Sequence, residues 1–119
     1  MPLDWSQGEL AEGLRCYRAE QFFLAHEHWE AVWLQCCDPE KAFLQGLIQI
    51  AAAFHHLQRN NALGASSLLQ GALRRLDPLP PHFGGIALGP LRENVRHWLQ
   101  ALSARDSQHP PFPEICCES

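Results

Sequence analysis

The residues best suited to chemistry lie on two segments whose apolar pattern predicts helices. Helical spacing places His26 and Glu30 on one face of the first segment, and Gln45, Gln49 and His56 on one face of the second. This follows because an α-helix turns about 100° per residue. Most neighbouring positions are apolar, and a polar group on a buried face costs about 1–3 kcal/mol unless it is hydrogen-bonded. We therefore expect the two polar faces to meet.

At a spacing of four residues, a carboxylate and an imidazole can share a proton or a metal ion. With Glu27 the first segment reads His-Glu-x-x-Glu, so it lacks the second histidine of the zinc-protease motif His-Glu-x-x-His. His56 could act as a third ligand, but the amides of Gln45 and Gln49 are poor ligands for transition metals. The sequence therefore predicts no bound metal and no cofactor.

Three kinds of function are compatible with these side chains. The first is a binding module for an unknown small ligand or protein, whose pocket between the two helices is lined by His26, Glu27, Glu30, Gln45, Gln49 and His56. The second is a hydrolase-like enzyme in which Glu30 works with His26 or His56 as an acid–base pair, with or without a metal. The third is a purely structural network of buried hydrogen bonds in an interaction protein. We favour the binding module and leave enzymatic activity open.

Length, charge and hydropathy limit the classes of partner that the protein is expected to bind. The chain has 119 residues, the size of one domain, and a net charge of −4. Its only adjacent basic pair is Arg74-Arg75, which argues against a nucleic-acid partner. No run of 18 apolar residues is present, so the sequence predicts no membrane span. A homodimer is one of the partners that the sequence leaves open.

The five cysteines are Cys16 and two adjacent pairs, Cys36-Cys37 and Cys116-Cys117. Neither pair has the two-residue spacer of a zinc-binding or redox motif. Reduced thiols are typical of the cytoplasm, and we expect the protein to be cytoplasmic.

Five helices are needed to position the polar residues. The apolar spacing predicts them at about 6–18, 20–36, 39–59, 62–76 and 90–104. Asp38-Pro39-Glu40 is a strong start signal, and Asn60-Asn61 suits the end of a helix. Small residues around Gly46 are expected to be where the helix at 20–36 crosses. We predict a single helical domain over 1–105 and a flexible, proline-rich tail over 106–119.

The predicted class is all-α, with antiparallel helical hairpins packed as a bundle. A weak internal repeat accompanies this prediction, because Ala25 and Trp29 precede Ala65 and Leu69 by forty residues. Two stacked hairpins, as in helical-repeat proteins, would give such a pattern.

Two runs of the chain resemble a known family of small prokaryotic proteins, the domain-of-unknown-function family 309. The runs are Phe22–Trp33 and Phe43–Ala53, the second followed by His56, within a resemblance that covers roughly Gly8 to Leu76. It implies an all-helical domain and no particular activity. The residues that match the family's characteristic positions are His26, Glu27, Glu30, Gln45, Gly46, Gln49 and His56. His55 stands where an aromatic residue is more usual.

Overall fold

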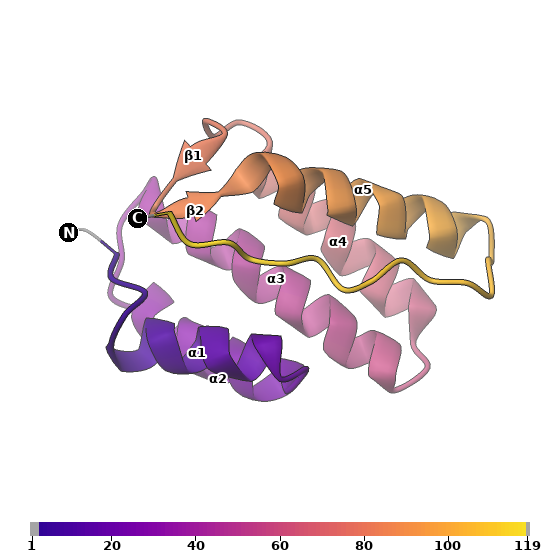
Figure 1. Ribbon diagram of the computed structural model, residues 1–119, viewed down its shortest axis with the longest axis horizontal. Coiled ribbons are helices and arrows are strands. Elements are labelled where there is room, and N and C mark those ends of the chain that lie inside the picture. The colour runs from indigo at the N-terminus through magenta and orange to yellow at the C-terminus, as the bar shows by residue number, and fades with distance from the viewer. Residues whose placement is uncertain (1–2, 119) are drawn as a thin grey trace.

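The computed structural model describes residues 3–118, and the all-α prediction is confirmed (Figure 1). Within this range the elements are α1 (Gly8–Arg18), α2 (Phe22–Trp33), α3 (Glu40–Gln58), α4 (Ala62–Leu76), β1 (His82–Phe83), β2 (Ile86–Ala87) and α5 (Leu88–Ser103). α1 packs on α2, α2 on α3, α3 on α4, and α4 on α5. α3 therefore has a helix on each side. None of the helices between residues 3 and 118 is long and apolar enough to cross a membrane.

Two helical hairpins, α1–α2 and α3–α4, are joined by the same backbone motif. Glu20 after α1 and Asn60 after α3 have positive φ angles of 60° and 61°. The residue after each donates its N–H to the carbonyl five positions back, which is the Schellman motif of helix ends. The predicted helix end at Asn60 is confirmed. The forty residues that separate the two motifs equal the interval of the weak apolar repeat.

Short polar side chains hydrogen-bond to the backbone at the starts of α3 and α4. Asp38 accepts a hydrogen bond from the backbone of Ala42 at 3.2 Å, although Pro39 is the N-cap of α3 rather than its first helical residue. Asn61 caps α4 by accepting from the backbone of Gly64 at 2.9 Å. α2 is shorter than predicted, because the left-handed residue Glu20 delays its start and the helix ends at Trp33.

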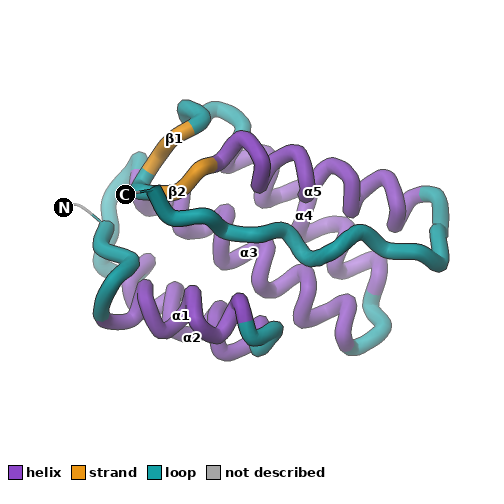
Figure 2. The backbone as a smooth tube through the Cα atoms, viewed as in Figure 1, coloured by secondary structure: helices purple, strands orange, loops and turns teal. Residues whose placement is uncertain are grey.

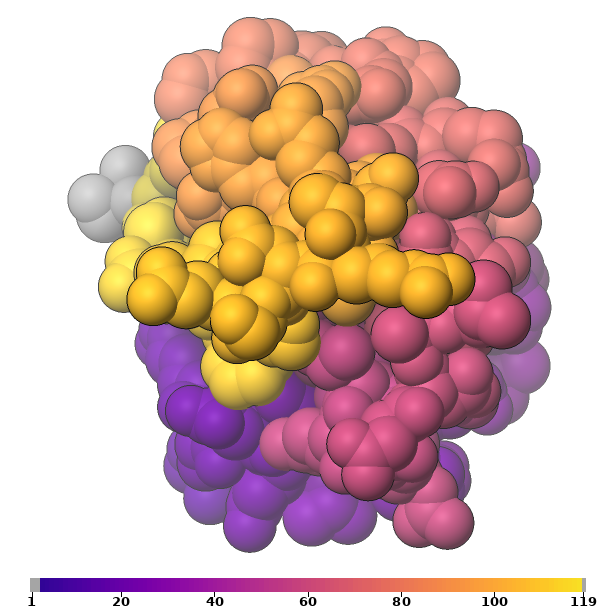
Figure 3. All heavy atoms as spheres, turned by 90° about the vertical axis from the view of Figure 1, so that its right-hand side faces the viewer, coloured from indigo at the N-terminus to yellow at the C-terminus, as the bar shows by residue number. Residues whose placement is uncertain are grey.

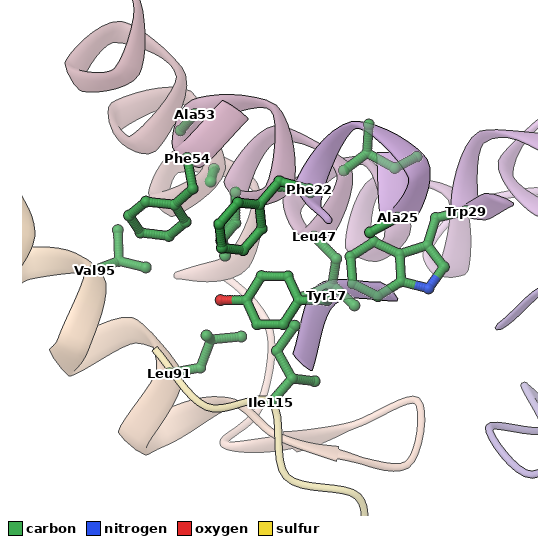
Figure 4. Packing of buried hydrophobic residues seen from close by; sticks show 14 of the residues in the cluster. Tyr17, Phe22, Ala25, Trp29, Leu47, Ala53, Phe54, Leu91, Val95 and Ile115 are labelled. Atoms are coloured by element: carbon green, nitrogen blue, oxygen red, sulfur yellow. The ribbon is translucent and has the colours of Figure 1, made fainter. Parts of the chain in front are cut away.

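Aromatic side chains contact one another in the core, and Tyr17, Phe22, Trp29 and Phe54 are labelled in Figure 4. Tyr17 stacks on Trp29 at 5.9 Å between ring centroids and meets Phe22 edge-on at 5.3 Å. Trp29 also covers Gly13, where an added Cβ would lie 2.3 Å from the indole nitrogen. Glycine at this position therefore lets α1 and α2 approach closely.

Gly46 serves a different contact from the one predicted. A Cβ at this position would lie 2.7 Å from a methyl carbon of Leu76, which belongs to α4. Gly46 itself therefore makes room for α4 and not, as predicted, for α2. α3 presents small residues to both of its neighbours, and spacing along α3 does not indicate which neighbour lies over which residue.

The residues after α5 differ from the expectation of a tail outside the helical domain. They turn back and run along the core as an extended loop, which Figures 1 and 2 show in front of the helices. Phe112 stacks on Trp98 at 5.6 Å and meets Phe22 and Phe54 at 5.0 Å each. Ile115 is only 1% exposed. We call residues 110–118 the C-terminal segment.

Carbonyl groups at alternate positions hold the C-terminal segment. The carbonyl of Pro111 accepts from Trp98 Nε1 at 2.9 Å, and that of Pro113 accepts from the Tyr17 hydroxyl at 2.6 Å. The carbonyl of Ile115 accepts from Arg18 at 3.0 Å. Backbone hydrogen bonds then join the segment to the β1–β2 hairpin. Prolines lack an N–H donor, which suggested a mobile tail, but their carbonyls still accept hydrogen bonds.

Candidate functional site

His26 and Glu30 meet on the surface of α2. Nε2 of His26 lies 3.3 Å from a carboxylate oxygen of Glu30, and the two side chains are 26% and 46% exposed. Glu27 is exposed one residue further round the helix. The contact between His26 and Glu30 that the four-residue spacing predicts is therefore present, but water reaches it.

The three residues on α3 lie apart from this pair. Gln49 accepts a hydrogen bond from Arg75 of α4 at 3.1 Å. Nδ1 of His56 lies 3.1 Å from the side-chain amide of Asn61, at the start of α4. Gln45 is partly buried. The expectation that the polar faces of α2 and α3 meet is therefore wrong for Gln49 and His56, which contact residues at or in α4.

Other residues of α3 contact α2. The Lys41 ammonium group lies over the Trp33 ring, 4.4 Å from its centroid, in cation–π geometry. The His55 ring lies 5.2 Å from the Phe23 ring. Residues 41 and 55 are fourteen positions apart, so helical geometry places them on nearly the same side of α3. That side is rotated about the helix axis by about 60–120° from the side that carries Gln49 and His56.

The buried hydrogen-bond network that the sequence also suggested is not present. Within residues 3–118 no charged, amide or histidine side chain is fully buried. Two polar atoms on α2, Nδ1 of His26 and Nε1 of Trp33, are shielded from solvent and have no hydrogen-bond partner in the described part of the chain. One ring nitrogen of His26 is therefore shielded, although the side chain as a whole is 26% exposed.

No metal site forms from these residues. In the described chain, no three histidine, cysteine, aspartate or glutamate side chains gather closely enough to hold a metal ion. Five cavities border the helices, and the six predicted pocket residues line none of these five.

The histidine rings of this surface lie close to one another and to charged groups, which affects the pKa of His55. Burial lowers the pKa of His55, and the nearby charges of Arg59, His56 and His26 lower it further. The Phe23 ring is stacked on His26 at 6.0 Å and tilted against His55. A half-exposed aromatic ring thus contacts two imidazoles, and the pKa of one of them, His55, is lowered by its surroundings.

Sequence reasoning missed the apolar residues on the outside of α2. Phe23, Leu24 and Leu34 are 48%, 46% and 67% exposed. Together with Glu27 and Glu30 they form what we call the outer face of α2. The three-residue spacing of Phe23 and His26 was a sequence signal for their contact. Exposure of the apolar residues had no such signal, because an apolar residue on a helix predicts burial.

Comparison with known proteins agrees with the family resemblance. An uncharacterized protein of Aquifex aeolicus (strain VF5) is 29% identical over 103 residues, which cover 86% of this chain. The aligned region spans only 30% of that relative's length. The family described as "Domain of unknown function (DUF309)" matches residues 10–68, from within α1 to within α4. Residues 10–68 of this chain are therefore similar to the DUF309 family, as the two sequence runs predict.

Proposed function

We propose that the protein is a binding module that docks a partner protein on the outer face of α2. One observation carries this proposal. Four large apolar side chains are exposed within residues 3–118, and three of them, Phe23, Leu24 and Leu34, belong to α2 or its C-cap. Exposed apolar side chains gathered on one helix are typical of protein-interaction sites.

Charge indicates the chemistry of the partner. Glu27 and Glu30 lie among the apolar residues, and the whole chain carries a net charge of −4. A partner with lysine or arginine beside its own apolar residues would be complementary. An amphipathic helix with a basic face meets this description.

Phe23 is suited to be the anchor of this surface. Its ring contacts the rings of both His26 and His55, and such contacts reduce the side-chain freedom that binding would have to remove. Aromatic anchors commonly supply a large part of the energy of a protein interface. The outer face includes Glu27 and Glu30 of the predicted site, with His26 beside them.

The test uses a designed amphipathic peptide that carries leucine on one face and lysine on the other, with a glutamate-for-lysine peptide as its control. We expect the basic peptide alone to bind, with an affinity that falls as salt rises. Phe23→Ala should weaken binding about ten-fold or more. Leu63→Ala is the matched control, because Leu63 is exposed on α4 and should not matter. Equal binding of both peptides, or no effect of Phe23→Ala, would reject the proposal.

A hydrolase-like function is the second candidate, favoured by the 3.3 Å contact between His26 and Glu30. It predicts turnover of model esters or phosphoesters by the purified protein. That turnover should disappear in both His26→Gln and Glu30→Gln while the fold is retained. Activity that survives in either variant would assign it to another source.

A further inference from the structure

The C-terminal segment lies in a groove built by four helices. Its walls are Tyr17 and Arg18 of α1, Phe22 of α2, Phe54 of α3 and Trp98 of α5. The groove takes apolar side chains of the segment and donates hydrogen bonds to its carbonyls at alternate positions. Grooves that bind extended peptides use this combination. Such contacts recognise the segment itself, whichever chain it belongs to.

The turn that delivers the segment contains a strained residue. α5 ends in the same Schellman motif as α1 and α3, here with Arg105 in the left-handed region at φ 52°. Glycine or asparagine usually occupies this position, since other side chains crowd the backbone there. Arginine therefore makes the closed turn less stable than it could be.

The same turn can straighten. Residues 103–108 are all exposed, and the Arg105 side chain forms no hydrogen bond or ion pair with the described residues. The sequence 104–108, Ala-Arg-Asp-Ser-Gln, contains neither glycine nor proline, so α5 can continue toward Pro110. Figure 3 faces this end of the molecule, where the residues after α5 lie on the surface.

We propose that two copies of the chain exchange their C-terminal segments and form a symmetric dimer, with each groove filled by the segment of the other copy. Every groove contact of the closed chain recurs in this dimer. The difference lies in the turn, where α5 continues and Arg105 leaves the left-handed region. Strain in a short hinge favours exchange of this kind. Because the segment must first leave its own groove, exchange should be slow.

Two substitutions at one exposed position test the proposal. Arg105→Gly relieves the closed turn, whereas Arg105→Val makes it worse, because a β-branched residue strongly disfavours positive φ. Each variant is unfolded, refolded at low and high protein concentration, and measured by size-exclusion chromatography with light scattering. After refolding at high concentration we expect the dimer-to-monomer ratio of Arg105→Val to exceed that of Arg105→Gly by about ten-fold or more. The wild-type chain should lie between the two.

Isotope labelling distinguishes exchange from association of two surfaces. In a dimer made from a mixture of labelled and unlabelled chains, the 5.6 Å contact between Phe112 and Trp98 becomes intermolecular if the segments have exchanged. An isotope-filtered nuclear Overhauser effect between these rings supports the proposal, and the same contact seen only within one chain overturns it. If Arg105→Val fails to fold, the wild-type dimer fraction is tested in the same way. Refolded wild-type and Arg105→Val chains that stay monomeric at high concentration also overturn the proposal.

Discussion

The C-terminal segment is more buried than its composition predicts, whereas His26 and Glu30 on α2 are more exposed than their apolar neighbours predict. The segment is rich in proline and follows the last helix, yet Ile115 is among the most buried residues and Phe112 joins the aromatic core. His26 and Glu30 are flanked by apolar residues on a helix, yet they meet in contact with solvent. Burial here follows from what packs over a residue rather than from its neighbours in sequence.

A segment without regular secondary structure can still contribute to the core, as Phe112 and Ile115 do. A carbonyl needs only a donor, and Tyr17, Arg18 and Trp98 supply donors from two different helices. Two apolar side chains of the segment then fill space between the helices. On α2, by contrast, no element within residues 3–118 covers the outer face, so Phe23, Leu24 and Leu34 stay exposed.

The largest effect is expected from Ile115→Ala. The side chain is almost fully buried, so its truncation should lower the free energy of unfolding by about 2–4 kcal/mol. Leu24→Ala removes a leucine of the outer face and should cost less than about 1 kcal/mol. Urea unfolding at low protein concentration measures both. Equal costs would contradict the contrast between the two regions.

A smaller effect is expected from Tyr17→Phe. The substitution removes only the hydroxyl that donates to the carbonyl of Pro113, and should cost about 1–2 kcal/mol because that carbonyl is left without its partner. The same unfolding experiment applies. The change should also increase proteolysis within residues 104–110, and an unchanged cleavage rate would mean that the hydrogen bond does not hold the segment.

Double-mutant cycles test the separation of the polar residues. Glu30→Gln and His56→Ala should add to within a few tenths of a kcal/mol, because Glu30 lies against His26 whereas His56 lies against Asn61. His26→Gln and Glu30→Gln should show a coupling of about 0.2–0.5 kcal/mol, as exposed pairs four residues apart do. A coupling near 1 kcal/mol or more between Glu30 and His56 would mean that these two residues share a hydrogen-bond network after all.

The smallest effect concerns protonation of His55. Burial and the charge of Arg59 lower its pKa, so folding favours the neutral ring. Its contribution to stability is therefore complete above the unfolded-state pKa and decreases as the pH falls from there toward the lower folded-state pKa. Arg59→Gln should raise the pKa of His55, measured by NMR titration of its ring protons. A pKa that stays unchanged would place Arg59 too far from the ring to act on it.

Local rules in the sequence account for much of the helical frame. The start signal near Asp38, the cap at Asn61 and the left-handed end at Asn60 each depend on one residue and on backbone no more than four positions away, which a sequence displays directly. The four-residue spacing of His26 and Glu30 likewise predicts a contact within one helix. These features need no knowledge of what packs against the helix.

Tertiary structure decided everything that depends on neighbours. Helical spacing puts Gln49 and His56 on one face of α3, but α3 lies between α2 and α4, and only the packing turned that face toward α4. Packing also brought Phe112 onto Trp98 and left Phe23 exposed. The physical reason is that apolar burial is not directional. A sequence shows which helix faces are apolar and are therefore expected to be buried, whereas the tertiary structure determines which segment packs against each of them.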